Sequence, residues 1–214
     1  MQALGYTAVP ALRKYLRLAE RQGLDLEAAL AAAGLERDDL RDNGRRLPSE
    51  THERLLGHLI AASGDPLFGL HAAEFVQPGS WSVLGYITMN CATLGEAMSR
   101  IAPYEKLVGD MGTSRIEPAA DHVRLIWHCR HETPEIRRHM VENVLASWLC
   151  YARWIADMQR SPREVWLEHQ RPAGTTQADY ETVFGCPVRF AQPVSALLVP
   201  LEFLDIPLRQ ADPN

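Results

Sequence analysis

Histidine and cysteine side chains that could bind a metal ion come close together at one point of the sequence. These residues are His128, Cys129 and His131. A zinc site needs three or four such donors at fixed spacing. The alternation expected of a strand here puts His128 and Cys129 on opposite faces, and the chain has neither a C-x-x-C pair nor an H-E-x-x-H motif. We therefore expect no metal, and surface or hydrogen-bonded histidines instead.

Nucleophilic catalysis is not indicated either. The sequence has no G-x-S-x-G motif. Many cysteine–histidine pairs can be chosen from this sequence, but without known distances between them they do not indicate a catalytic pair. The cysteines are far apart and do not resemble a disulfide framework, so we expect buried reduced thiols. They are Cys91, Cys129, Cys150 and Cys186. We expect no catalytic residue, no cofactor and no enzymatic activity.

Aromatic residues are concentrated in the middle of the chain, with four of the five tryptophans between residues 81 and 154. Trp and Tyr can line an apolar pocket and still offer a hydrogen bond. Polar residues nearby could face the same pocket, and Arg137 could pair with a ligand carboxylate. The candidate ligand-binding residues are Trp81, Tyr86, Tyr104, Trp127, Arg137, His139, Asn143 and Trp148. The alternative is that the aromatic residues belong to an ordinary core and that Arg137 is solvated.

The overall composition is that of an ordinary globular chain. Its 214 residues allow one large domain or two small ones, and the formal net charge is −5. A mildly acidic chain is poorly suited to bind DNA alone, because phosphate neutralisation needs a basic face. No signal peptide and no apolar run long enough to span a bilayer are evident. We expect a cytoplasmic protein with no membrane partner.

The first half of the chain has helical character. Apolar residues recur at three- and four-residue steps, and Asp25, Asp65-Pro66 and Thr93 are typical helix starts. Glu96 follows Thr93 at the spacing of a capping box. The expected helices cover about residues 9–19, 26–33, 49–63 and 66–75. A further helix is expected from about residue 81 through residue 87, and another from residue 94 to residue 101, with residue 104 as its furthest extent.

The second half changes its period. Val123, Leu125 and Trp127 alternate onto one face, which predicts a strand over 122–128 paired in a hairpin with 113–117. The longest helix is expected over 135–158, a short helix over 176–184, and further strands over 165–169, 187–190 and 196–199. The predicted fold class is α+β: an N-terminal helical half followed by a small, mostly antiparallel sheet packed on one long helix.

Several motifs resemble one protein family when their order and spacing are taken together. The strongest is the segment Gly64-Asp65-Pro66-Leu67-Phe68-Gly69-Leu70. The others are Gly23 to Leu26, Ala33 to Leu35, Arg46 to Pro48, Leu84 to Tyr86, Thr93 to Ala97, Phe184 to Phe190, Leu197 to Pro200 and Leu204 to Leu208. Together they resemble the N-terminal effector-binding, arabinose-binding-like domain of AraC/XylS-type bacterial transcription regulators.

This resemblance implies a function. Residues 1–208 would form one effector-binding and dimerisation domain, and residues 209–214 would begin a linker to an absent C-terminal helix-turn-helix domain. The implied partners are an unidentified small-molecule effector and a second copy of the chain, with DNA bound only through the absent domain. The alternative is a dimerisation or protein-interaction scaffold without a small-molecule ligand. The long helix and the first helix are the candidate dimer surfaces.

Overall fold

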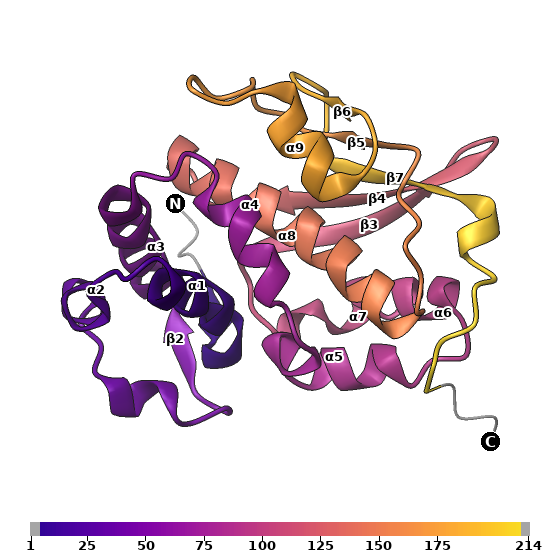
Figure 1. Cartoon of the computed structure of the whole chain (residues 1–214). Helices are drawn as coiled ribbons and strands as arrows, with labels where there is room; N and C mark the ends of the chain where they lie inside the picture. Colours follow the sequence, from indigo (N-terminus) through magenta and orange to yellow (C-terminus); the bar gives the residue numbers. More distant parts are fainter. Residues whose placement is uncertain (1–4, 211–214) are drawn as a thin grey trace.

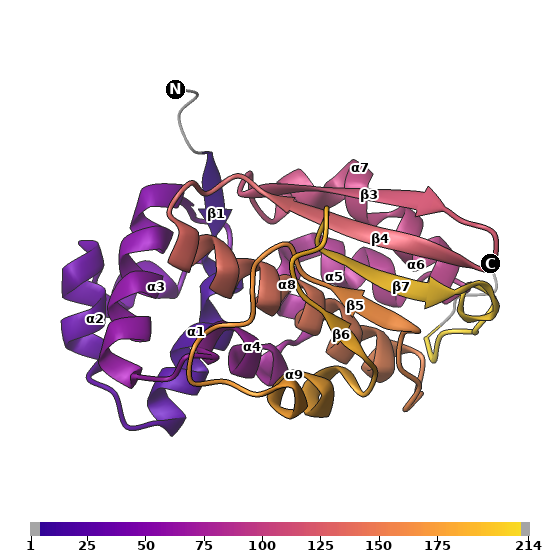
Figure 2. The same ribbon diagram turned by 90° about the horizontal axis from the view of Figure 1, so that it is seen from above.

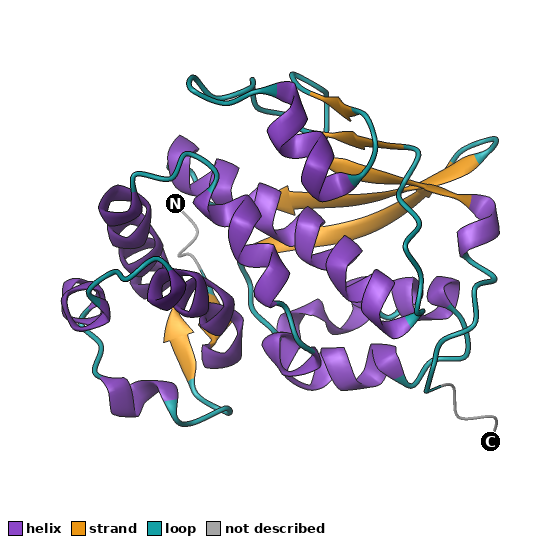
Figure 3. Cartoon of the chain, in the orientation of Figure 1, coloured by secondary structure: helices purple, strands orange, loops and turns teal. Residues whose placement is uncertain are grey.

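The computed structural model describes residues 5–210, which form a helical half and a sheet joined by one long helix (Figures 1 and 3). The α-helices are α1 (Val9–Arg21), α2 (Leu26–Ala33), α3 (Ser49–Ser63), α4 (Phe68–Ala72), α5 (Ser82–Met89), α6 (Leu94–Ser99), α7 (Ile101–Tyr104), α8 (Pro134–Ile155) and α9 (Gln177–Phe184). The short 3-10 helices are η1 (Arg37–Leu40), η2 (Ala73–Phe75), η3 (Pro78–Trp81), η4 (Glu105–Leu107) and η5 (Leu201–Phe203). The expected α+β class is confirmed.

The main sheet has the strand order β3-β4-β7-β5-β6. Its strands are β3 (Gly112–Pro118), β4 (His122–Cys129), β5 (Glu164–Trp166), β6 (Val188–Arg189) and β7 (Ala196–Pro200). The β3–β4 hairpin pairs Gly112 with Cys129, β4 and β5 are antiparallel to β7, and only the β5–β6 pair is parallel. From above, α8 lies beneath this sheet and α1–α3 lie beside it (Figure 2).

Helix α8 is buried along most of its length. Pro134 begins it, where the missing N–H of proline is tolerated. Only the ends carry well-exposed side chains, such as Glu135 and Trp154, because the helix is wedged between the sheet and the other helices. Helix α1 is covered in a similar way, with nine of its residues buried. Neither α1 nor α8, the two candidate dimer surfaces, therefore has a broad exposed face.

The motif at residues 64–70 is a compact joint between α3 and α4. Gly64 ends α3 in the left-handed region at φ 61°, which favours glycine. The Asp65 carboxylate accepts the Leu67 N–H at 2.9 Å and lies 2.8 Å from His71 Nδ1. Phe68 is fully buried. The motif thus fixes the point where α4 turns against α8.

Some predicted elements differ from the structure. The helix expected to continue from residue 94 breaks at Arg100 into α6 and α7, because Pro103 has no N–H to donate to Ser99. The strands expected over 165–169 and 187–190 are shorter, and the helix expected over 66–75 ends in the 3-10 turn η2. The 3-10 turn η3 lies in the break expected before α5, which begins at Ser82. The two-stranded sheet β1 (Tyr6–Ala8) and β2 (Arg46–Pro48) was not predicted.

The helix caps agree more closely with expectation. Asp25 accepts the Ala28 N–H at 3.0 Å, and Thr93 accepts the Glu96 N–H at 3.2 Å. Glu96 reaches back to the N–H of Ala92 rather than that of Thr93, so the capping box is shifted by one residue. Within residues 5–210, no helix combines the length and the apolar character needed to cross a membrane.

Candidate ligand-binding cavities

Two adjoining cavities lie between the helices and the inner face of the sheet. Both are bounded by Trp81, Ile101 and Trp148, so these three residues form the partition between them. Trp81 comes from η3, Ile101 from α7 and Trp148 from α8. The partition therefore depends on helices from different parts of the chain.

The first cavity, which we call the apolar cavity, has a volume of about 60 Å³. Its one hydroxyl-bearing aliphatic residue is Thr88, whose hydroxyl already donates to backbone carbonyls of α5. Besides the partition, the wall includes Leu94, Ala97, Met98, Leu125, Leu149, Tyr151, Ala152, Ile155, Met158, Pro162, Leu197, Val199 and Phe203. Because none of the described residues exposes a polar group on the wall, this cavity favours apolar ligands.

The second cavity, which we call the polar pocket, has a volume of about 90 Å³, enough for several water molecules or part of a small ligand. Its polar side chains are Lys14, Tyr15, His52, Glu105 and Ser114. The rest of its wall is mostly apolar and includes Ala11, Leu84, Val108, Met111, Trp127, Met140 and Val144. Apolar walls with a few placed polar groups are typical of small-molecule sites.

Lys14 is the most unusual residue of the polar pocket. It lies on α1 among apolar neighbours, and 5% of its surface is exposed. Its Nζ lies 5.5 Å from the centre of the Tyr15 ring. Among the described residues no carboxylate pairs with it, and burial alone lowers its pKa to about 7. A buried amine without a counter-ion is rare, because the charged form loses its hydration.

His52 of α3 lies beside Lys14 in the same wall. Its ring is 5.5 Å from that of Tyr15, and Nδ1 lies 2.9 Å from the Met111 sulfur. Nε2 is buried and has no hydrogen-bond partner within residues 5–210. Burial, together with the nearby His131 and Lys14, lowers the pKa of His52 to about 3. The imidazole is therefore neutral at physiological pH.

Glu105 of η4 contributes the acidic side chain of the polar pocket. Its carboxylate accepts the backbone N–H of Ser114 at 2.8 Å. Partial burial raises its pKa, and the hydrogen bonds from Ser114 oppose this effect. Because this contact joins η4 to β3, Glu105 fixes one edge of the pocket.

The structure divides the candidate residues predicted from the sequence into three groups. Trp81, Trp127 and Trp148 line the cavities. Tyr86 and Tyr104 are partly exposed at the surface, with 54% and 39% of their surface accessible. Three candidates on α8 line neither cavity: Arg137 lies 3.6 Å from Glu168, and both His139 and Asn143 bind the backbone of Gly69.

Sequence reasoning missed the polar end of the pocket. Lys14, Tyr15 and His52 were not among the candidates, and neither was Glu105. A signal for two of them was present. Lys14 lies three residues after Ala11 and four before Leu18 on an apolar helix face, and His52 precedes Leu55 and Leu56 at helical spacing. A charged or polar residue within such a stripe indicates either a satisfied core group or a binding site.

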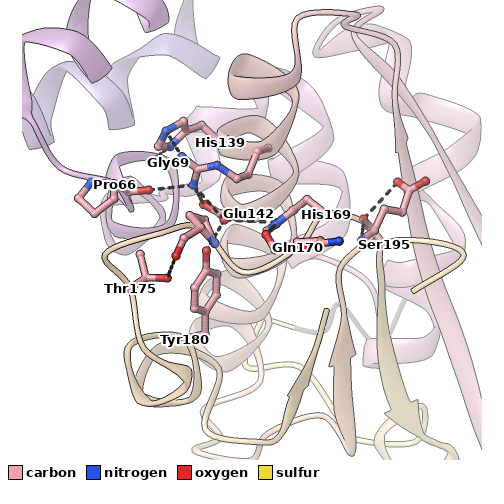
Figure 4. Close-up of polar contacts among 12 residues, drawn as sticks. Pro66, Gly69, His139, Glu142, His169, Gln170, Thr175, Tyr180 and Ser195 are labelled. Atoms are coloured by element: carbon pink, nitrogen blue, oxygen red, sulfur yellow. Dashed lines mark hydrogen bonds and ion pairs between the residues drawn. The ribbon is translucent and has the colours of Figure 1, made fainter. Parts of the chain in front are cut away.

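A second group of buried polar residues lies around Glu142 on α8 (Figure 4). The Glu142 carboxylate accepts the Tyr180 hydroxyl at 2.6 Å and two contacts from Arg138 at 3.3 Å, and His169 Nε2 lies 3.3 Å from it. Arg138 also donates to the Pro66 carbonyl at 2.8 Å. These residues line neither cavity, so they join α4, α8 and α9 and do not form part of the pocket.

The residues first considered as metal ligands are separated in the structure. His128 is exposed on β4, while Cys129 is buried and points to the other face. His131 is fully buried and lies 3.3 Å from Glu53. Within the part of the chain that the structure describes, no group of three histidine, cysteine or acidic side chains is placed to hold a metal ion.

The chain is similar to known bacterial regulators. It is 24% identical over 218 residues to the ornithine utilization regulator of Pseudomonas aeruginosa, covering 99% of this chain and 63% of that protein. It therefore spans less than two thirds of the length of this relative. The crystal structure of the transcriptional regulator CdpR from Pseudomonas aeruginosa has the same fold, with a TM-score of 0.70 at 17% identity over 95% of this chain and 58% of that one.

A sequence model of a domain family also matches most of this chain. Residues 23–208 match the arabinose-binding domain found at the N-terminus of AraC transcription regulators. This match includes α8, the whole main sheet and most of the wall of both cavities, while α1 with Lys14 and Tyr15 precedes it. The chain belongs to the family of N-terminal arabinose-binding domains of AraC transcription regulators.

Proposed function

We propose that this chain senses a small-molecule effector and thereby controls DNA binding by a C-terminal domain of the same regulator. The observation that carries the proposal is the pair of adjoining cavities separated by Trp81, Ile101 and Trp148. Their walls combine the helical half with the sheet, so a ligand between them would contact both. A ligand that contacts both can change how they are arranged. The proposal gives the chain no catalytic role.

A route from the cavities to the C-terminal end supports this function. Phe203 of η5 lines the apolar cavity. The segment after it is held against α6, where Leu94 and Gly95 donate their N–H groups to the carbonyls of Ile206 and Leu204, both at 2.9 Å. Since α6 also supplies cavity wall, a ligand that moves α6 would move this segment with it.

We propose the domain boundary at the end of this segment. Residues 1–208 form the sensing domain, and residues 209–214 begin the linker. Leu208 is buried, and the Arg209 N–H donates to the Ile155 carbonyl at 2.9 Å, which ties the start of the linker to α8. Residues 211–214 lie outside the described residues.

The energetic requirement on such a sensor is modest. A ligand shifts an equilibrium between two arrangements only by its difference in affinity for them. A 100-fold difference corresponds to about 2.7 kcal/mol of coupling. The loss or gain of a few apolar contacts in the cavities is of this order.

We also propose that the domain forms a homodimer, because dimers match paired half-sites on DNA. Exposed apolar side chains favour self-association. Val83 and Tyr86 on α5 and Trp154 on α8 are each about half exposed. The same residues support the second candidate, a dimerisation or protein-interaction scaffold without a ligand. The two candidates differ in whether a small molecule binds the cavities.

A thermal-shift screen of small metabolites tests the sensor. Ornithine should be included, because one relative is a regulator of ornithine utilization. An effector at 100 times its Kd should add about 2.7 kcal/mol of stability, which raises Tm by about 5–10 °C for a domain of this size. Trp148→Phe should reduce this shift. Trp166→Phe is the matched control, because Trp166 lies on the outer face of the sheet and lines neither cavity.

The outcomes separate the candidates. A compound whose stabilisation depends on Trp148 and not on Trp166 supports the sensor. If no metabolite raises Tm and Trp148→Phe leaves regulation in the full-length protein intact, the scaffold is favoured instead.

A further inference from the structure

The polar pocket contains a buried amine that forms no ion pair with any described carboxylate. Lys14 is one of only two lysines in the chain, the other being the exposed Lys106. Lys14 lines the pocket with 5% of its surface exposed, and no described carboxylate pairs with it. Burial of an unpaired amine destabilises the fold. A position of this kind is typical of a binding residue whose partner is a ligand.

The surroundings of Lys14 limit the charge of that ligand. Among residues 5–210, the formally charged side chains that line the pocket are Lys14 and Glu105, and the Glu105 carboxylate accepts the Ser114 N–H at the η4–β3 edge. His52 is neutral and leaves Nε2 without a partner, and the buried Tyr15 hydroxyl adds a further neutral donor. Lys14 can balance one negative charge on a ligand, whereas a dianion such as phosphate would leave its second charge unbalanced in a pocket that already contains Glu105.

The remaining wall limits the body of the ligand. From Lys14 the pocket leads to Trp81, Ile101 and Trp148, and beyond these residues lies the apolar cavity. A neutral polyol placed here would lose the hydration of its hydroxyl groups against apolar walls and would leave Lys14 without a counter-ion. An apolar chain or ring, by contrast, gains from burial against aromatic side chains.

We propose that the polar pocket binds a small organic monocarboxylate whose carboxylate pairs with Lys14 and whose apolar body lies against Trp81 and Trp148. This inference rests on the proposed sensing function and assigns its ligand class. His52 and Tyr15 complete the binding of the carboxylate as neutral hydrogen-bonding groups.

Matched pairs of probes test this assignment. Hexanoate is compared with hexanamide and phenylacetate with phenylacetamide, because each pair keeps the apolar body and removes the charge. L-Arabinose serves as the neutral polyol and acetate as the anion without an apolar body. Binding is measured at constant ionic strength by calorimetry and by the NMR signals of ε-labelled lysine. With two lysines in the chain, Lys106→Met identifies the Lys14 signal.

The expected result is at least tenfold tighter binding of the carboxylates than of their amides at pH 6. Lys14→Met should remove this preference, Lys14→Arg should keep part of it, and Lys106→Met should leave it unchanged. In the wild-type protein the bound carboxylate should raise the pKa of Lys14, so carboxylate affinity should fall as pH rises from 7 to 9. His52 on α3, Glu105 on η4 and Tyr15 on α1 face the same pocket, so their signals are followed as well.

The wild-type measurements need no variant, so they hold even if Lys14→Met folds poorly. Equal binding of carboxylates and amides overturns the assignment, as does an unchanged Lys14 signal on binding. If carboxylates fail while another metabolite stabilises the protein through Trp148, the ligand class is wrong and the sensing function stands. If nothing in either experiment binds and Trp148→Phe leaves regulation in the full-length protein intact, both proposals are wrong.

Discussion

Gly69 of α4 lies directly against His139 of α8: a Cβ atom at Gly69 would be 2.1 Å from the His139 carbonyl oxygen. The Gly69 N–H donates to His139 Nδ1 at 3.1 Å, and its carbonyl accepts from Asn143 Nδ2 at 2.8 Å. The side chains of His139 and Asn143 therefore hold α4 close to α8 where the two helices cross. The same helix presents Met140 and Trp148 to the polar pocket.

The first prediction concerns this crossing. Gly69→Ala should lower the free energy of unfolding by about 2–3 kcal/mol, because the added methyl group forces the helices apart. Gly57→Ala is the control, since its Cβ would meet Ile136 Cδ1 at an ordinary 3.5 Å. In a helix this change should be neutral or stabilise by about 1 kcal/mol. Urea unfolding compares the two, and equal stability of Gly69→Ala and wild type would contradict the tight crossing.

The fold could be predicted from the sequence wherever its signals are local. Caps such as Asp25 and Thr93 act within one helical turn, and the apolar stripe of α8 is long enough to predict a helix without any information from the rest of the chain. The β1–β2 pair could not be predicted, because each strand has three residues and its partner is distant in the sequence. Three residues are too few to show alternation, and their pairing depends on the tertiary fold.

The second prediction concerns the buried amine. Lys14→Met should raise the free energy of unfolding at pH 6 by about 1–3 kcal/mol in the absence of ligand, because it removes a charged group from an apolar site. The folded pKa is about 7 against 10.5 for the unfolded chain. Between these values the unfolded state binds more protons, so wild-type stability rises with pH. The advantage of the variant should therefore shrink from pH 7 to pH 10.

Chemical unfolding at a series of pH values measures this difference. Lys106→Met is the matched control and should show no such dependence, since Lys106 is exposed. A constant difference between Lys14→Met and wild type across the range would rule out the buried amine as its source.

The third prediction concerns Glu142. Burial raises its pKa from 4.5 to about 7, and this outweighs the opposing effects of Arg138 and Tyr180. Between pH 4.5 and 7 the folded state therefore binds more protons than the unfolded state, so this group makes stability fall as pH rises. Glu142→Gln should remove that decline, which is on the order of 2 kcal/mol.

The measurement is the pH dependence of the unfolding free energy of Glu142→Gln against wild type. Glu135→Gln, on the exposed start of the same helix, is the control and should follow the wild-type curve. Parallel curves for Glu142→Gln and wild type would show that the carboxylate stays ionised in the fold.

The candidate site could be predicted only in part. Trp81, Trp127 and Trp148 were noticed because large aromatic residues are rare and line pockets often. Lys14 and His52 were missed because a polar residue on an apolar helix face has several meanings. Which meaning applies depends on the opposite wall, formed by η4 and the β3–β4 hairpin, and no local pattern reveals that packing.

The fourth prediction concerns the wall of the polar pocket. A Cβ atom at Gly112 would lie 2.4 Å from the Trp127 ring, so Gly112→Ala must displace that ring. The expected loss is about 1–3 kcal/mol of unfolding free energy. Trp127→Phe offers a smaller ring that leaves room for the methyl group. In a double-mutant cycle the two changes should be coupled by more than about 1 kcal/mol, and simple additivity would show that the ring is not in contact with Gly112.

The fifth prediction concerns self-association. Trp154 stacks on Tyr151 at 6.1 Å between ring centres, yet 48% of its surface is exposed, and Tyr86 is 54% exposed. Tyr151 also donates to the carbonyl of Gly85 on α5, so it ties α5 to the end of α8 that carries Trp154. Large exposed aromatic residues are enriched at interfaces.

If these side chains form the dimer contact, Trp154→Ser should weaken dimerisation at least tenfold in sedimentation experiments. Leu201→Ser is the control, because Leu201 is similarly exposed on η5. A dimer that loses affinity equally in both variants would place Trp154 outside the specific dimer contact, and a wild-type chain that stays monomeric would contradict the proposed homodimer.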